Sequence, residues 1–373
     1  MPSKSWHNHM ISICLYGIVK EFRPATPFLT PFLVSEKNVT LEEAYSQIYP
    51  IWTYSYMLAL IPVFILTDLL RYKPIIILEA VGLVATWILL VFGDGLFQMQ
   101  LMQITFGVSS AAEIAYFSYM YAIVDDKNYA KVASYIQSAA LFGKLFAFGM
   151  GQVLITTGWS TYLFLNQVSL GATLVVFIIS IFLPSVRPPV TSPNQDFTRE
   201  PLTRGDAEKT KMDRGVGNYA QSLWAEMQFD SHHVENGLVE FTRSLLGVLV
   251  SFLIQFWKLD WLKHGHSVLF VSSLVISASL FVSAANQNIY VAYSIANIAR
   301  EVSSSSHGLI FGFNTLVAVV LQSLLTFVVV DKSMLHMDIR SQFYVYAAYF
   351  LAVSLLFLLN LLISCVRGNS TSS

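Results

Sequence analysis

The chain has little charge for its length. Only 12% of its 373 residues are Asp, Glu, Lys or Arg, whereas 55% are hydrophobic and 14% are aromatic. This composition, with repeated apolar runs of bilayer length, excludes an ordinary soluble domain. The formal net charge of −1 says nothing about partners, and we expect a lipid bilayer around the chain and no nucleic acid. We therefore predict an all-α polytopic membrane protein.

Cysteines and catalytic motifs are also scarce. Cys14 and Cys365 lie at opposite ends of the chain, so no disulfide framework or cysteine-based metal site can be argued. The sequence has no Walker loop, no Gly-x-Ser-x-Gly elbow and no His-Glu-x-x-His. The histidine pairs at 232–233 and 264–266 lack a third ligand and are expected in loops. We expect no enzyme, no cofactor and no ATP-driven pump.

Apolar runs divide the chain into two halves. A helix that crosses the hydrocarbon core needs about 20 residues. Runs of about this length or longer lie at 48–69, 74–93, 97–124, 131–157 and 162–184 in the first half, and at 238–257, 267–285, 308–330 and 343–365 in the second. Two further runs, 216–228 and 289–299, are too short to cross. The sequence predicts two helical bundles.

The first run, 9–34, is interrupted by charged residues and by three prolines. Lipid would not tolerate these groups, so we expect a broken helix that lines a cavity. No cleavable signal peptide is expected, because this segment has no small-residue cleavage pattern. Counting this helix, residues 1–186 form a first lobe of six spans.

Residues 187–215 combine basic residues with prolines, serines and acids, and are predicted to be a polar cytoplasmic linker. A second lobe, 216–365, and a cytoplasmic tail, 366–373, follow. Basic residues in the turns at 68–73 and 125–131 place the amino terminus in the cytoplasm.

The loop 35–47 is mostly acidic and would lie outside the cell. It contains Asn38-Val39-Thr40, an N-glycosylation acceptor sequence. Asn38 is therefore a candidate glycosylation site.

Glu113 lies inside the apolar run 97–124, among small residues. A carboxylate at membrane depth is costly, and its small neighbours favour a position facing a protein cavity rather than lipid. Such a buried negative charge suits a cation.

Several phrases resemble the reduced-folate and thiamine carrier family, in the family's order and in both halves. They are Arg23–Pro31, Tyr49–Tyr56, Thr67–Pro74, Ala111–Tyr116, Asn236–Glu240 and Phe311–Thr315. The resemblance implies a twelve-helix major-facilitator fold that carries water-soluble vitamins across the plasma membrane without ATP hydrolysis.

The resemblance also suggests a substrate. Folate carriers have an arginine at the position of Glu113 and a lysine at that of Gln322, so both positions are thiamine-like here. Thiamine is a cation with aromatic rings, which suit a carboxylate and aromatic walls. The implied substrate-site residues, listed together, are Glu113, Tyr116, Trp52, Tyr49 and the further family carboxylate Glu240. Alternatively, the three aromatic residues pack in the interior or at the membrane interface. Glu240 would then form only a local pair with Arg243, one helical turn later.

Two further candidate substrate-site residues depart from the family pattern within the first half. Thr26 stands where the family commonly has Glu, and Lys144 is a cation in the middle of the fifth run. At 1.5 Å per residue, Lys144 and Glu113 lie at similar depth, about 20 and 15 Å from their cytoplasmic ends. We therefore predict that Lys144 pairs with Glu113.

The second half looks internally shortened by comparison with the family, at the runs 216–228 and 289–299. We expect poor order around 216–235 and 286–307, because an incomplete helix leaves polar backbone groups unsatisfied in the hydrocarbon. The main hypothesis is a secondary transporter of thiamine or a related organic cation. The alternatives are a non-transporting shortened membrane protein of the same family and a folate carrier.

Overall fold

The computed structural model describes residues 5–70, 72–123, 129–184, 219–227, 235–254, 261–285, 323–324, 326–330, 335 and 337–370. The regular structure in these residues is helical throughout. This confirms the predicted all-α fold.

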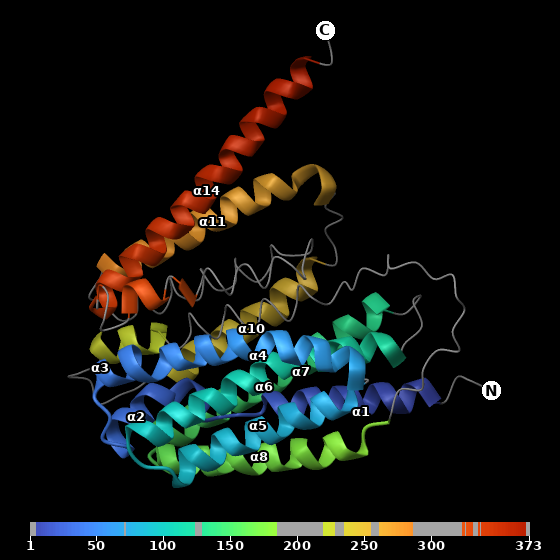
Figure 1. Cartoon of the computed structure of the whole chain (residues 1–373), viewed down its shortest axis with the longest axis vertical. Coiled ribbons are helices and arrows are strands. Elements are labelled where there is room, and N and C mark those ends of the chain that lie inside the picture. The colour runs from blue at the N-terminus through green and yellow to red at the C-terminus, as the bar shows by residue number, and fades with distance from the viewer. Residues whose placement is uncertain are drawn as a thin grey trace.

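The helices of the first half form one bundle and pack side by side (Figure 1). Their bounds are α1 Ser5–Glu21, α2 Leu29–Glu36, α4 Tyr49–Leu70, α5 Lys73–Phe92, α6 Leu96–Ile123, α7 Tyr129–Thr156 and α8 Tyr162–Phe182. Within the bundle α5 lies between α6 and α8, α4 packs on α6, and α1 packs on α7. These helices coincide with the predicted spans to within a few residues.

Local sequence signals explain where several helices begin. The hydroxyl of Thr161 accepts a hydrogen bond from the amide of Phe164, which caps α8. The short helix α3, Leu41–Glu43, starts with a capping box formed by Thr40 and Glu43, and is followed by η2, Ala44–Ile48. A proline in the first turn of α5 fits there because its missing N–H has no partner in a helix.

The predicted break in the first helix is confirmed. α1 ends at Glu21, and the chain turns through residues 22–25 before the 3-10 helix η1, Thr26–Phe28, leads into α2. The charged residues that flank the break, Lys20, Glu21 and Arg23, are all buried in protein. The break therefore lies where polar side chains, rather than lipid, surround the backbone.

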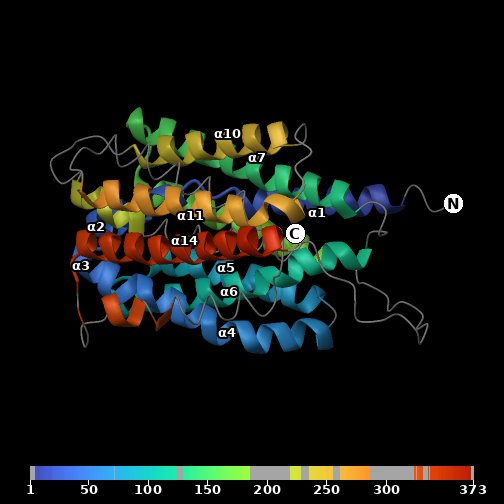
Figure 2. The same ribbon diagram turned by 90° about the horizontal axis from the view of Figure 1, so that it is seen from above.

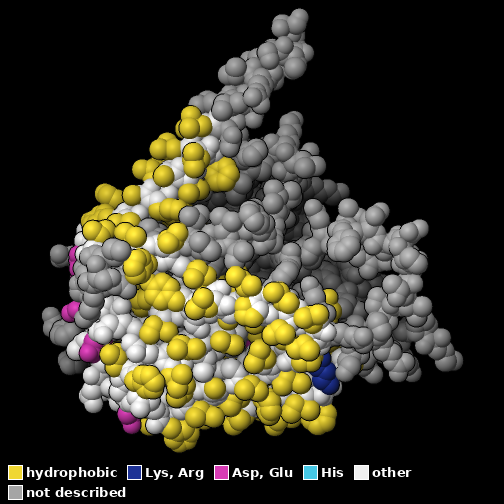
Figure 3. All heavy atoms as spheres, in the orientation of Figure 1, with side chains coloured by type: hydrophobic (Ala, Val, Ile, Leu, Met, Phe, Trp, Pro, Cys, Tyr) yellow, Lys and Arg dark blue, Asp and Glu magenta, His cyan; other side chains and the backbone are white. Residues whose placement is uncertain are grey.

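In the described part of the chain, five helices are long and apolar enough to cross a bilayer: Leu41–Thr67, Lys73–Phe92, Tyr135–Thr156, Tyr162–Phe182 and Ile339–Leu359. Figure 3 shows hydrophobic side chains covering much of the visible described surface, with acidic side chains along one end of the bundle. Exposed large residues such as Leu58, Phe92 and Phe182 belong to this apolar exterior. The surface is that of a protein embedded in lipid.

Within the described residues, the second half contributes three long helices: α10 Asn236–Ile254, α11 Trp261–Ala285 and α14 Ile339–Ser370. α11 and α14 lie side by side, and α10 packs on α7 of the first half (Figures 1 and 2). The expectation that His264 and His266 lie in a loop is wrong, because α11 already begins at Trp261. The linker 187–215, the run 289–299 and His232-His233 lie outside the described residues, as does most of the run 308–330.

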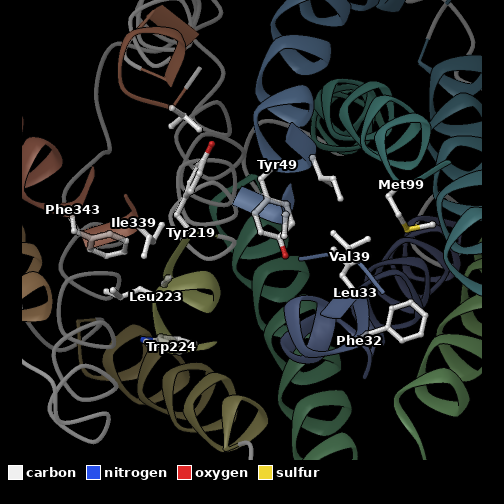
Figure 4. Packing of buried hydrophobic residues seen from close by; sticks show 14 of the residues in the cluster. Phe32, Leu33, Val39, Tyr49, Met99, Tyr219, Leu223, Trp224, Ile339 and Phe343 are labelled. Carbon is white, nitrogen blue, oxygen red and sulfur yellow. The ribbon is translucent and has the colours of Figure 1, made fainter. Parts of the chain in front are cut away.

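Residues 219–227 form a helical segment that connects the two halves. The ring centroid of Tyr219 lies 6.3 Å from that of Tyr49 in the first half (Figure 4). It lies at the same distance from the ring centroid of Tyr346 in α14. Trp224 is buried, and Glu226 accepts a hydrogen bond from Arg340 of α14 at 3.1 Å. The expected poor order is therefore wrong for 219–227, while residues 228–234 and 286–307 lie outside the described residues.

Candidate functional site

A cavity lies where the broken first helix meets α5, α6, α7 and α10. Its volume is about 90 Å³, within a wider space that opens to solvent. This is room for several water molecules. Its lining comes from both halves of the chain, because α10 and Gln221 contribute as well as the first-half helices.

One wall of the cavity is charged. Arg23 Nη2 lies 2.8 Å from Glu21 Oε2, and Lys144 Nζ lies 3.7 Å from the same oxygen. On α10, Arg243 Nε lies 2.9 Å from Glu240 Oε2. The described lining therefore holds three cationic and two anionic side chains, a formal excess of one positive charge.

The part of the lining from α5 and α6 is aromatic and amide-bearing, and Arg23 lies 5.5 Å from the ring centroid of Trp87. This part includes Trp87, Phe106 and Gln103. Among the described residues, no hydrogen-bond partner is found for the Nε1 of Trp87 or for the side-chain Nε2 and Oε1 of Gln103, although all three atoms are buried. Buried polar groups normally have partners, so these atoms are candidates to bind a ligand.

The cavity contains three of the predicted site residues. Thr26, Lys144 and Glu240 line it. Glu240 also forms the local ion pair with Arg243 that the sequence offered as an alternative. Thr26 is exposed at the break, and its backbone carbonyl accepts a hydrogen bond from Gln221 at 3.1 Å.

Glu113 and Tyr116 do not belong to this lining. They are part of a buried cluster around Lys20, the residue before the end of α1. Lys20 Nζ is 2.6 Å from Glu79 Oε1 and 2.9 Å from Glu113 Oε1. The same ammonium lies 4.7 Å from the ring centroid of Tyr116, and Tyr16 donates to Glu79 at 3.1 Å. One lysine therefore forms ion pairs with two carboxylates, and only 2–3% of each of these side chains is exposed.

The predicted pair of Lys144 and Glu113 is wrong. Glu113 contacts Lys20, and Lys144 contacts Glu21. Similar depth along two helices gives no information on their lateral separation. In the bundle, α1 packs closely against α7 and also touches α6. Charged side chains of α1 therefore pair with both Lys144 and Glu113.

Trp52 and Tyr49 are buried and do not belong to the described lining of the cavity. The indole of Trp52 stacks on Tyr56 at 5.8 Å and lies 6.4 Å from Phe106, which does line the cavity. Its Nε1 donates to Ser110 at 3.3 Å. The hydroxyl of Tyr49 lies 2.6 Å from the Thr30 hydroxyl. Asn38 is exposed in the turn after α2, with a positive φ of 53°, and stays a predicted glycosylation site.

Sequence reasoning missed Glu79 and Gln103 as site or cluster residues, and it named Arg243 only as a partner of Glu240. Glu79 carries the same signal as Glu113, since it is an acid inside an apolar run, at 74–93. Gln103 has no such signal, because an amide in a helix of this composition is unremarkable until its neighbours are known.

Comparison with known proteins agrees with this architecture. A family model described as "Reduced folate carrier" matches residues 4–215 and 209–345. Folate transporter 1 of Caenorhabditis elegans is 48% identical, with 99% of this chain and 95% of that protein covered. Thiamine transporter 1 is 33% identical in Mus musculus and 32% in Homo sapiens, with 98% and 97% of this chain and 92% and 91% of those proteins covered.

Solved structures support the fold alone, because their sequence identities are low. A point mutant of the nucleoside transporter NupG has a TM-score of 0.61 at 9% identity, covering 94% of this chain and 99% of that one. An auto-inhibited POT family peptide transporter also has a TM-score of 0.61, at 12% identity, covering 94% and 96%. The fold is that of major-facilitator-type transporters, and the chain belongs to the reduced folate carrier family.

Proposed function

We propose that the chain is a secondary transporter of a water-soluble vitamin and that it works by alternating access, without catalysing a covalent reaction. The observation that carries this proposal is the cavity shared by the two halves, whose lining combines charged and aromatic side chains. In transporters of this type the substrate site lies between the two halves near the midplane, and rocking of the halves exposes it to either side.

The described charges favour an anionic vitamin of the folate type as the first candidate. The cavity lining has an excess of cations, and Glu113, which suggested a cationic substrate, contacts Lys20 outside that lining. Folates combine a flat heteroaromatic head with a glutamate tail. Trp87 and Phe106 suit the head, while cationic side chains suit the tail.

Thiamine is the second candidate. The carboxylates of Glu21 and Glu240 both face the cavity, and a thiazolium cation could replace their present cationic partners. The thiamine transporters among the relatives support this reading, although at lower identity than the folate transporter.

A shortened, non-transporting protein is the remaining alternative. The alignment with Folate transporter 1 extends over 429 positions, more than the 373 residues of this chain. This supports internal segments that the relative has and the chain lacks. Against this alternative, Tyr219 contacts both Tyr49 of the first half and Tyr346 of α14. These contacts favour a second half that can still pack against the first.

We place the protein in the plasma membrane with its amino terminus, the linker 187–215 and the tail 366–373 in the cytoplasm. Glu36, Glu42 and Asp94 lie near one end of the first-half bundle, whereas Lys73 starts α5 at the other. That distribution follows the tendency of basic residues to stay on the cytoplasmic side. Loss of a glycan from the Asn38→Gln variant, seen as a mobility shift, would test this orientation.

The deciding experiment is uptake of labelled folate and labelled thiamine by cells that lack their own carriers, at measured surface expression. Saturable folate uptake supports the first candidate, and saturable thiamine uptake alone supports the second. Absence of both, with the protein at the surface, would establish the non-transporting alternative. An epitope tag at 255–260, between α10 and α11, then reports whether the second half is inserted with that connection in the cytoplasm.

A further inference from the structure

Two acidic residues are brought together deep in the first-half bundle by the packing of α5 on α6. A Cβ on Gly82 of α5 would lie 2.9 Å from the Cβ of Ser109 on α6, and the Ser109 hydroxyl donates to the Glu79 carbonyl at 2.9 Å. Glu79 lies one turn before Gly82 on α5. Glu113 lies one turn after Ser109 on α6. Two carboxylates that share a buried site repel each other, and a cation between them relieves the repulsion.

Lys20 of α1 supplies this cation from within the chain. Its Nζ lies 2.6 Å from Glu79 Oε1 and 2.9 Å from Glu113 Oε1, and only 3% of the lysine side chain is exposed. Hydrogen bonds between an ammonium and a carboxylate are among the strong ones in proteins. The lysine therefore holds the position between the two acids in the structure.

An aromatic ring completes the surroundings of the ammonium. The ring centroid of Tyr116 lies 4.7 Å from Lys20 Nζ, within the range of a cation–π interaction. The Tyr116 hydroxyl donates to the carbonyl of Ile13 on α1 at 2.9 Å. The lack of a side chain at Gly17 leaves room for that hydroxyl, since a Cβ there would lie 2.8 Å from it. Helix α1 thus fixes the ring that its own lysine contacts.

Two carboxylates beside an aromatic face are groups that suit an organic ammonium ion. We propose that Lys20 is a specificity-determining residue, whose ammonium takes the place of such an ion and thereby excludes cationic substrates. A cation from outside would have to displace a side chain that is tethered at its position, which gives the lysine a high effective concentration there. The proposal rests on the proposed transport function and favours the anionic vitamin among its two candidates.

The position of Lys20 in the chain links this cluster to the cavity. The next residue, Glu21, lines the cavity and ends α1. The charge of the cluster therefore acts on a ligand in the cavity through protein, where it is screened less than through water. Without the lysine, a cationic ligand near the break would be attracted by carboxylates that are no longer neutralised.

The first test measures binding to the purified full-length protein and needs no transport. Lys20→Ala removes Cγ, Cδ, Cε and the ammonium, which are together the heavy atoms of n-propylammonium. This ion should raise the melting temperature of Lys20→Ala by roughly 2 °C or more at saturation, because a ligand that binds the folded state stabilises it. It should not stabilise the unmodified protein or Lys20→Arg, since both keep an internal cation. The uncharged 1-propanol, of similar size, should stabilise none of them.

A second pair of variants keeps the test decisive if Lys20→Ala does not fold. Lys20→Ala/Glu79→Gln leaves a single buried carboxylate, that of Glu113, and so lacks the repulsion between two acids. Its matched control adds Glu113→Gln, which leaves the same missing lysine but no acid. The ion should stabilise the double variant and not the triple one. Equal responses of the two folded proteins, or no response of either, would overturn the proposal.

The second test is uptake of labelled thiamine at equal surface expression. Lys20→Ala/Glu79→Gln should take up thiamine at least about tenfold faster than the unmodified protein and Lys20→Arg. Equal thiamine uptake by all three would overturn the role of Lys20 in specificity. Stabilisation by n-propylammonium as expected, with no uptake of any vitamin by any variant, would count against the transport function and still support the lysine as an internal substitute for a cation.

Discussion

Lys20 contacts two carboxylates at once, Glu79 at 2.6 Å and Glu113 at 2.9 Å, each from a different helix. The lysine belongs to the broken first helix, and the acids belong to α5 and α6. The ion pairs therefore hold the break against the rest of the first half. Glu113 acts here as a structural anchor as well as a candidate for substrate binding.

The first prediction concerns this cluster. Lys20→Met should lower the stability of the purified protein by roughly 3 to 5 kcal/mol, because it removes the cation shared by two buried carboxylates. Lys37→Met is the control, since its exposed partner should make that pair worth about 1 kcal/mol or less. Thermal unfolding in detergent measures both. Adding Glu79→Gln and Glu113→Gln to Lys20→Met should restore stability, and failure of this rescue would contradict the charge argument.

The second prediction concerns the crossing of α1 and α7. A Cβ on Gly143 would clash with the backbone carbonyl of Ile18, whereas one on Gly171 of α8 would meet nothing within 4 Å. Gly143→Ala should therefore destabilise the protein by about 1 to 3 kcal/mol through overpacking. Gly171→Ala should be neutral or slightly stabilising, since alanine favours helix. Equal melting temperatures for the two variants would show that the crossing is looser than described.

The third prediction separates packing from substrate contact at Tyr49. Tyr49→Phe removes a hydroxyl that lies 2.6 Å from the hydroxyl of Thr30, in a fully buried setting. We expect a loss of about 1 to 3 kcal/mol in stability, because the buried Thr30 loses a hydrogen-bond partner. The KM for the vitamin should change less than twofold. A large KM change with unaltered stability would instead place the Tyr49 hydroxyl in the substrate site.

The fourth prediction concerns acid sensitivity at the start of α14. Hydrogen bonds from Ser341, first from its side chain and then from its backbone amide, hold the pKa of Asp338 below its usual range. A lowered folded-state pKa means that Asp338 stabilises the protein above the pKa of the unfolded state. This contribution is lost as the pH falls through the folded-state pKa.

Asp338→Ala should cost about 1 kcal/mol near neutral pH, as expected for loss of a helix cap. The difference from the unmodified protein should shrink below about pH 4, near the ordinary pKa of aspartate. Melting curves at several pH values measure it. A difference that stays constant into acid would mean that the ionised carboxylate is not what caps the helix.

Hydropathy was sufficient to predict the spans of the first half, because a bilayer requires long apolar helices whatever their neighbours are. The break after Glu21 was also predictable, since charges and prolines together cannot face lipid. Both features depend only on the local sequence and on the surrounding lipid, so no knowledge of distant contacts is needed to predict them.

The charge partners were not predictable in the same way. Lys144 and Glu113 have similar depth, but depth does not say that α1 lies close to α7. The segment 219–227 was expected to be poorly ordered because it is too short to span. Its order comes from long-range contacts, with Tyr49 and Tyr346, that no local pattern encodes. Gln103 was missed for the same reason.

The break in the first helix also has a kinetic consequence. Backbone groups at the break are bonded to side chains from three other segments: Ala25 N–H to Ser169 of α8, the Thr26 carbonyl to Gln221, and the Pro27 carbonyl to Asn236 of α10. Gln221 and Asn236 follow the linker, whereas Ser169 precedes it. If the halves separate during a cycle, the bonds from Gln221 and Asn236 must be exchanged for water before the movement is complete. These two amides would then contribute to the activation barrier of turnover, and the temperature dependence of the transport rate, more than affinity, would respond to them.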